Sequence, residues 1–124
     1  MEFINKNEDL LLQSISGGYY ILDSEITRFD IYFENHQLNI VVYFTLPYHR
    51  FQTDKKIKLH FIGVIEYEFY WNDKFTFYIV ERYKFLKTER GFYISFDPYD
   101  ESEEPSEEDH DIILCNEVEG FFLW

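Results

Sequence analysis

Hydrophobic and polar residues alternate along most of the chain beyond residue 19. The segment 27–34 places Phe29, Ile31 and Phe33 on one side and its polar residues on the other. Successive side chains of a strand point to opposite faces, so a period of two predicts half-buried β-strands. Applied along the chain, this rule predicts strands at about 26–34, 38–46, 57–71, 75–86, 92–96 and 112–123.

Short links join the predicted strands. ENHQ (34–37) and NDK (72–74) are of hairpin length, and Pro47, which has no backbone N–H, marks the end of a strand. Gly63 interrupts the long segment 57–71 and predicts a bend or bulge there. Hairpin links between neighbours predict an antiparallel, meander-like and strongly curved sheet. Its apolar face must be covered by its own curvature or by a helix.

One helix is predicted, at residues 5–16. Asn5 with Glu8 three residues later has the spacing of a capping box, in which each side chain satisfies a free backbone N–H. The glycine pair at 17–18 fits the end of the helix. The apolar residues that recur at helical spacing, and that would form its buried face, are Leu11, Leu12 and Ile15.

Composition strengthens the prediction of a mostly β fold. Aromatic residues make up 22% of the chain, and alanine is absent. Aromatic side chains suit a pleated surface, and alanine is the best helix former. A length of 124 residues is typical of one domain. We therefore predict a single α+β domain over 1–124, mostly β, with one short N-terminal helix and about six antiparallel strands.

Cysteine usage and the N-terminus bear on the compartment. Cys115 is the one cysteine, so no internal disulfide can form, which fits a reducing environment. The N-terminal stretch has acidic residues and no basic region before an apolar core, so we expect no secretory signal. No apolar run reaches the roughly 18 residues of a membrane span. We expect a cytoplasmic protein that does not insert into membranes.

Acidic residues gather in one segment. Residues 97–111, called here the acidic segment, hold nine of the 24 acids and no Lys or Arg, which gives a charge of −9. The rest of the chain has 15 acids and 11 bases, which leaves −4 of the net −13. This balance disfavours direct binding to nucleic acid or anionic membrane and is compatible with a basic partner.

The acidic segment lacks the spacing of a calcium loop. EF-hand ligands alternate around a central glycine, whereas Pro98 and Pro105 interrupt this segment and it contains no glycine. We therefore predict no metal and no cofactor. Two interpretations stay open. The segment is a solvated loop that its charge keeps out of the core, or it is a docking element that steers a basic partner.

Catalytic chemistry has few candidates. Acids near Cys115 would raise the pKa of its thiol and make it a poor nucleophile. Glu81 falls in phase with the apolar face of 75–86, so Glu81 with His60 is the arrangement we consider for an enzyme with an unfamiliar site. Nucleophile elbows and phosphate-binding loops are absent from the sequence. We expect no enzymatic activity.

The second face of the predicted sheet is rich in tyrosine. Helix 5–16 would cover this face in part, or the face is an exposed interface, since Tyr is enriched where proteins bind one another. Both interpretations stay open, as do a monomer and a homodimer. The tyrosines that share this face are Tyr32, Tyr43, Tyr70, Tyr78 and Tyr93.

The order of features resembles that of a known group of proteins. A short helix leads into SGGYYILDSEITRFDIYFENHQLNIVVYFTL, and GFYISFDPYDE with SEEDHD precedes a terminal strand that ends in EGFFLW. This layout is similar to small bacterial proteins encoded beside toxin genes, among them immunity proteins of polymorphic and contact-dependent toxin systems. The stretch DPYDE…SEED (97–109) is the most specific part of the resemblance. It implies a protein that binds a cognate toxin, blocks its active site or substrate path, and has no catalytic residues.

These observations together lead us to expect a non-catalytic protein-binding module, in the first place an immunity protein against a basic toxin. The alternatives are a small-molecule or divalent-metal-binding β domain and a homo-oligomeric structural protein. The residues expected to contact the partner are Asp97, Asp100, Glu101, Glu103, Glu104, Glu107, Glu108, Asp109, Tyr32, Tyr43, Tyr78 and Tyr93.

Overall fold

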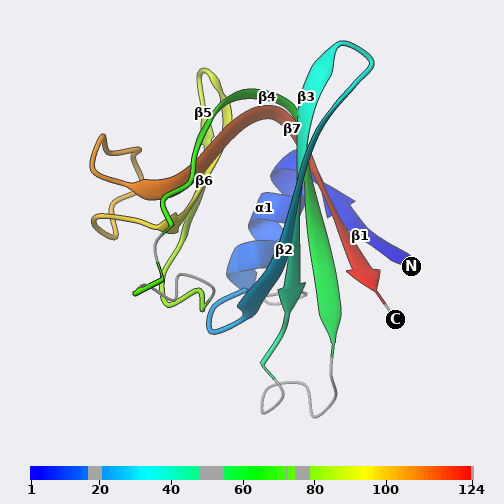
Figure 1. Cartoon of the computed structure of the whole chain (residues 1–124), viewed down its shortest axis with the longest axis horizontal. Coiled ribbons are helices and arrows are strands. Elements are labelled where there is room, and N and C mark those ends of the chain that lie inside the picture. The colour runs from blue at the N-terminus through cyan, green and yellow to red at the C-terminus, as the bar shows by residue number, and fades with distance from the viewer. Residues whose placement is uncertain (17–20, 48–54, 72, 75–78, 124) are drawn as a thin grey trace.

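The alternating segments fold into antiparallel strands of one curved sheet, and the predicted fold class is confirmed (Figure 1). The structure, a computed structural model, describes residues 1–16, 21–47, 55–71, 73–74 and 79–123. Its elements, in chain order, are β1 (Glu2–Lys6), α1 (Asn7–Ser16), β2 (Glu25–Glu34), β3 (Gln37–Thr45), β4 (Lys56–Glu68), β5 (Lys84–Thr88), β6 (Gly91–Asp97) and β7 (His110–Leu123). Apart from β1 and β5, the strands begin and end within three residues of the predicted positions.

The last strand of the chain lies in the middle of the sheet. The strand order is β2-β3-β4-β7-β6-β5. β7 pairs with β4 along one side, while its other side pairs first with β6 and then with β1. Consecutive residues Ile113, Leu114 and Cys115 are all buried, although they point alternately to opposite faces. Burial on both faces requires a continuous apolar run, which explains why this segment occupies the centre.

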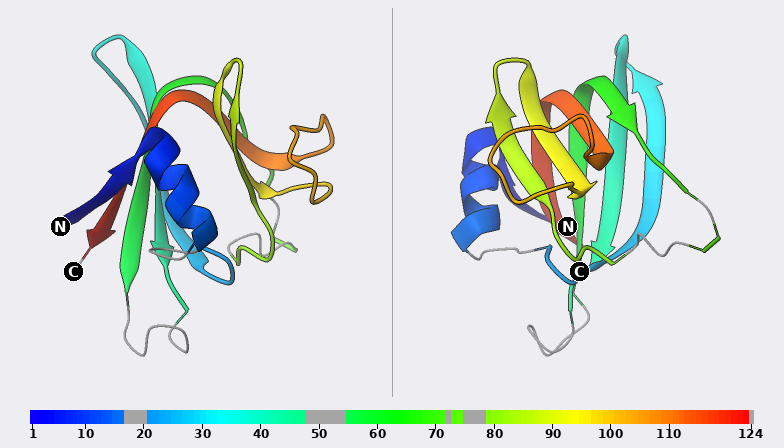
Figure 2. Two further views of the ribbon diagram at one scale, coloured as in Figure 1. Left: turned by 180° about the vertical axis from the view of Figure 1, so that it is seen from behind. Right: turned by 90° about the vertical axis from the view of Figure 1, so that its left-hand side faces the viewer.

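The sheet bends where β4 and β7 pass from one half of it to the other. Both strands form an arch, and the two halves lean toward each other over a shared core (Figures 1 and 2). The rings of Phe44 in β3 and Phe96 in β6 meet across this core at 5.8 Å. Gly63 has a φ of 65°, and the register of β4 against β7 shifts between Val64 and Glu66. Glycine adopts such a backbone at little cost, and the bend predicted at Gly63 is confirmed.

Helix α1 covers the concave side of the sheet, where it contacts β1, β5 and β7 (Figures 1 and 2). Leu10 is fully buried and lies against Gly120, where an added Cβ would be 2.7 Å from Leu10 Cδ1. Leu11 packs partly on the core, but Leu12 is 60% exposed, so the predicted helix face was wrong at that position. The side chain of Ile15 lies outside the described residues.

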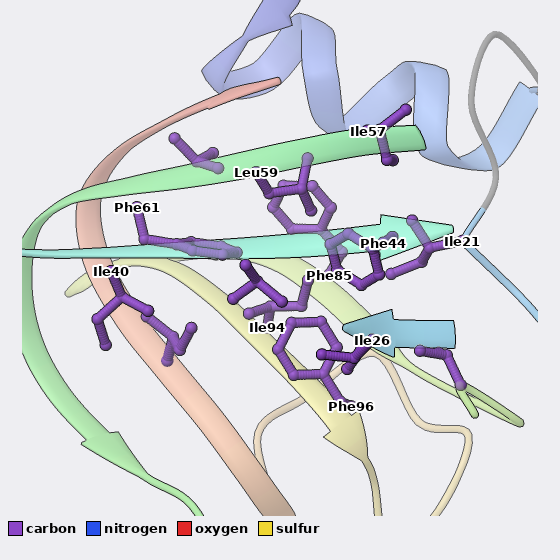
Figure 3. Packing of buried hydrophobic residues seen from close by; sticks show 14 of the residues in the cluster. Ile21, Ile26, Ile40, Phe44, Ile57, Leu59, Phe61, Phe85, Ile94 and Phe96 are labelled. Carbon is purple, nitrogen blue, oxygen red and sulfur yellow. The ribbon is translucent and has the colours of Figure 1, made fainter. Parts of the chain in front are cut away.

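The core is a continuous cluster drawn from both halves of the sheet. Figure 3 shows Ile57 and Leu59 beneath the helix and Phe44 among side chains from the other strands. Full burial of an aliphatic or aromatic side chain contributes roughly 1.5–3 kcal/mol. The labelled side chains of the cluster are Ile21, Ile26, Ile40, Phe44, Ile57, Leu59, Phe61, Phe85, Ile94 and Phe96.

The N-terminus differs from its prediction. Residues 2–6 form β1, which pairs with 119–122 of β7, and the helix begins at Asn7. Asn5 therefore lies in a strand, and the predicted capping box is wrong. Asn7 has a φ of 50°, and its Oδ1 accepts a hydrogen bond of 2.9 Å from the backbone N–H of Val118. This bond satisfies the backbone of β7 between the stretch that pairs with β6 and the stretch that pairs with β1. Asn7 itself lies where the chain passes from β1 into α1.

The predicted strand 75–86 and its hairpin with 57–71 are wrong in the part that the structure describes. Residues 75–78 lie outside the described residues, and the strand found here is β5. The carbonyl of Val80 accepts a backbone hydrogen bond of 2.7 Å from Asp23, and its N–H donates one of 2.9 Å to Ser24, just before β2 begins. β4 pairs with β7 instead, in a register that runs from Lys56 opposite Leu123 to Glu68 opposite Ile112.

Candidate functional site

The acidic segment lies over the outer face of β5 and β6, as Figure 2 shows. Together with the adjoining part of β7, that face carries Lys84, Tyr93 and Leu114, whose neighbours along each strand point into the core. Lys84 is 4% exposed, Tyr93 5% and Leu114 4%. Lysine is almost never fully buried unless it is paired. The segment is thus a cover for this half of the sheet.

Asp109 is the centre of this cover. Its carboxylate accepts hydrogen bonds from the hydroxyl of Tyr93 at 2.7 Å and from the backbone N–H groups of Tyr99 and Ser106, each at 2.8 Å. Both of its oxygens lie 3.1 Å from Lys84 Nζ. The side chain is completely buried. One carboxylate therefore joins the beginning and the end of the segment to the sheet below.

Lys84 completes the cluster from the side of the sheet. Its Nζ lies 2.7 Å from Asp100 Oδ1 and donates to the backbone carbonyl of Glu104 at 2.8 Å, in addition to its contact with Asp109. Nearby, Arg82 donates to the carbonyl of Pro98 at 2.8 Å. An ammonium group has three donors, and those of Lys84 are used on three parts of the segment. We call this arrangement the Lys84–Asp109 cluster.

The groups of the Lys84–Asp109 cluster stabilise one another in their charged forms. Burial disfavours charge on Asp109, but hydrogen bonds from Tyr93 and its other donors outweigh it, so the pKa of Asp109 lies below its usual value. Burial likewise opposes the charge of Lys84, yet its contacts with Asp100 and Asp109 raise its pKa. The bond from Lys84, together with one from Ser102, lowers the pKa of Asp100 to about 2. The cluster is therefore ionised over the physiological pH range.

The other predicted contact residues of the segment face solvent. Asp100 is partly exposed, at 44% of its side chain, while Asp109 is not exposed at all. Asp109 thus holds the segment from within and offers no surface to a partner, which corrects its predicted role. The exposed acids are Asp97, Glu101, Glu103, Glu104, Glu107 and Glu108.

A groove of about 640 Å³ runs beside the acidic segment. Its rim combines Glu107 with Glu66 and Glu68 of β4 and with Glu89 of the β5–β6 turn. Its floor includes the apolar side chains of Ile112 and Leu114, and Arg90 is the basic residue in its lining. Such a groove suits a long basic side chain, whose aliphatic stem packs on the floor while its charge meets the carboxylates.

The predicted tyrosines do not form one exposed surface. Tyr93 is buried beneath the acidic segment, and Tyr78 lies outside the described residues. Tyr32 and Tyr43 are half-buried on the outer face of β2 and β3. The hydroxyl of Tyr32 lies 3.2 Å from Nε2 of His60. Helix α1 covers the opposite, concave face, so the interpretation that it covers the tyrosines is wrong.

The described residues do not support the catalytic arrangements considered above. Glu81 is exposed and lies before β5, so its predicted place on the core face is wrong. Burial raises the pKa of the Cys115 thiol to about 12, and burial lowers the pKa of His60. No group of three or more His, Cys, Asp or Glu side chains among the described residues is arranged to hold a metal ion.

Comparisons of the chain with protein-family models, curated proteins and solved structures found no match in any of the three. Evidence for the function therefore comes from the geometry of the acidic segment and of the groove beside it. No helix in the part of the chain that the structure describes is long and apolar enough to cross a membrane.

Several residues of this surface were not predicted from the sequence. Lys84 is the most important of them, and Glu66, Glu68 and Glu89 join the groove from distant parts of the chain. The sequence did contain a signal for Lys84. This lysine lies between two aromatic residues, at a position that alternation assigns to the face opposite the core. A segment of nine acids also needs a cation if it folds against the sheet.

Proposed function

We propose that the chain is a non-catalytic binding protein that presents the acidic segment and its groove to a basic protein partner. The Lys84–Asp109 cluster supports this proposal, because it fixes the segment on the sheet from beneath. The acids that project from it, such as Glu103, Glu107 and Glu108, then form a surface of set position. A loop that served only solubility would not need a buried ion pair to hold it in place.

Fixed carboxylates have a kinetic and an energetic advantage for binding. A local excess of negative charge attracts a basic partner over a distance of about one Debye length and raises the association rate. A segment that is already folded also loses less conformational entropy on binding than a loose one. The groove adds specificity, since it offers carboxylates and an apolar floor together.

We further propose that the partner is a toxin and that the chain is its immunity protein, acting in the cytoplasm. The resemblance of the layout supports this step, and so does the charge. A toxin that acts on nucleic acid has a basic substrate path, and an acidic surface of this kind complements it. Binding would keep substrate away from that path without any chemical step.

The test is co-expression with the product of the adjacent gene. We expect the two proteins to co-purify, and we expect the neighbour to be toxic alone and inactive in the complex. A neighbour that has no toxicity and does not associate with the chain would contradict the immunity proposal. If the two proteins associate but the neighbour is not toxic, the proposed binding function stands and the proposal that the partner is a toxin is contradicted.

A further inference from the structure

The groove of about 640 Å³ beside the acidic segment contains the same pair of side chains twice. In the register of β4 against β7, Glu66 lies opposite Leu114, and Glu68 lies opposite Ile112. Residues directly opposite each other in an antiparallel pair point to the same face of the sheet. Each glutamate therefore stands beside one apolar side chain of the groove floor.

The strand fixes the distance between these two pairs. Glu66, Tyr67 and Glu68 are each paired in turn with β7, so this stretch of β4 is regular. A strand rises about 3.3 Å per residue, which places the two glutamates about 6.6 Å apart along β4. Every second side chain of an extended peptide has the same spacing and points to the same side. The groove thus matches the repeat of an extended chain.

The negative charge of the groove is not neutralised by ion pairs within the described residues. The ion pairs found there join other side chains, and none of them includes a glutamate of the groove. Arg90 is the basic residue in the lining. Four exposed glutamates (−4) and one arginine (+1) leave a charge of −3 on the groove, and the glutamates are Glu66, Glu68, Glu89 and Glu107.

We propose that the groove binds an extended segment of the protein partner in which two lysine or arginine residues are separated by one residue. The charged ends of the two side chains meet Glu66 and Glu68, while their aliphatic stems pack along Leu114 and Ile112. The residue between them points away from the groove. This inference rests on the proposed binding function, and it names the feature of the partner that the groove recognises.

The groove and the acidic segment then act on different steps of binding. Exposed carboxylates attract a basic partner from a distance and act mainly on the association rate. Side chains held in a groove make their contacts only after docking, and the loss of such contacts changes mainly the dissociation rate. Variants of Glu66 and Glu68 should therefore shorten the lifetime of a complex more than they slow its formation.

Two blocked peptides of equal composition, Lys-Ser-Lys and Lys-Lys-Ser, test the spacing on the full chain. Peptides of this length do not form helices, and adjacent side chains of an extended chain point to opposite sides. Lys-Ser-Lys can place both lysines in the groove, whereas Lys-Lys-Ser can place one. In titrations followed by NMR at low salt, we expect Lys-Ser-Lys to bind roughly three- to tenfold more tightly.

A double variant, Glu66→Gln with Glu68→Gln, shows whether the groove is the source of this preference. Both residues are exposed, so the variant should keep the wild-type melting temperature, and it should bind the two peptides equally. The matched control is Glu2→Gln with Glu117→Gln, which removes the same charge from exposed sites outside the groove and should keep the preference. Equal affinities of wild type for the two peptides would overturn the proposal, and so would a preference that the groove variant retains.

The co-purified partner separates this inference from the proposed function. We expect the groove variant to dissociate from the partner at least about threefold faster than the control variant. If the partner binds wild type and the groove variant dissociates at the control rate, the groove proposal fails and the binding function stands. If the partner does not bind wild type at all, the binding function is contradicted and the groove proposal falls with it.

Discussion

At the scale of single residues, one carboxylate has the largest influence on the acidic segment. Asp109 is buried with Lys84, and donors from Tyr93, Tyr99 and Ser106 surround it. A buried ion pair is not by itself stabilising relative to apolar residues, because both charges lose their hydration. Removal of one partner is a different matter, since it leaves the other charge buried and alone. The pair thus specifies how the segment lies more than it adds to stability.

Asp109→Ala should therefore destabilise the protein by about 3–5 kcal/mol, as is typical when one partner of a buried pair is removed. Urea denaturation followed by circular dichroism measures the change. Glu108→Ala is the matched control, because the adjacent Glu108 is exposed, and a change at such a site is usually within about 0.5 kcal/mol. Equal midpoints for the two variants would contradict the role given to Asp109.

The same contacts predict how stability depends on pH. The folded protein lowers the pKa of Asp109 and Asp100. Their contribution is therefore present above the unfolded-state pKa of about 3.9 and is lost as pH falls through the folded-state values. Denaturation between pH 6 and 2 should show this loss. Lys84→Met removes the cation and should make the decline shallower, whereas an unchanged slope would mean that other groups cause it.

The burial of Asp111 predicts a pH dependence of stability opposite in sign to that of Asp109 and Asp100. It is 3% exposed, and its burial raises its pKa even though its Oδ1 accepts a hydrogen bond of 2.9 Å from the N–H of Tyr70. The ionised form is therefore disfavoured in the fold at neutral pH. Asp111→Asn keeps an acceptor, and Asn tolerates the φ of 54° found there. At pH 7 it should stabilise the protein in urea denaturation, with the gain lost as pH falls below the unfolded-state pKa of about 3.9.

At the scale of elements, the β5–β6 turn depends on one glycine. Gly91 has a φ of 142°, and a Cβ there would lie 2.3 Å from the backbone oxygen of Cys115. Gly91→Ala should destabilise the protein by roughly 2–3 kcal/mol, since both the backbone conformation and the close approach forbid a side chain. Gly120→Ala is the comparison, because its Cβ meets the movable tip of Leu10. A smaller loss at Gly91 than at Gly120 in thermal melts would contradict this interpretation.

The strands that the sequence predicted well are those in which apolar and polar residues alternate over many residues. The segments of β2, β3 and β4 alternate clearly, and their extents follow from that pattern to within three residues. β1 was missed because five residues are too few for a pattern, and its pairing with β7 is set by the whole fold. The pairing of β4 with β7 joins distant parts of the chain, and local alternation contains no information about such partners.

At the scale of the whole molecule, the sequence shows where the negative charge lies but not the contacts that hold the acidic segment on the sheet. The nine acids of 97–111 identify the segment, and their exposed members remain the candidate contact residues. The sequence did not separate Asp109, which is buried, from its exposed neighbours. That distinction depends on Lys84, which only the packing of β5 against β6 brings beneath the segment.

This distinction sharpens the design of a charge-reversal experiment. Reversal of Asp100 or Asp109 would disturb the cluster that holds the segment, so any loss of binding would be ambiguous. Glu103, Glu107 and Glu108 are exposed and can be changed without touching it. Three acids elsewhere on the surface, Glu2, Glu25 and Glu117, give a control variant of equal net charge.

The central claim is tested most directly by the rate of association with the co-purified partner at low and at high salt. It is measured for two variants, in each of which one of these sets of three glutamates is replaced by lysine. We expect the change of Glu103, Glu107 and Glu108 to lower the rate by at least about tenfold at low salt and to remove most of its salt dependence. The control at Glu2, Glu25 and Glu117 should stay within about threefold of wild type. Equal rates for the two variants would contradict the claim that the acidic segment is a docking surface.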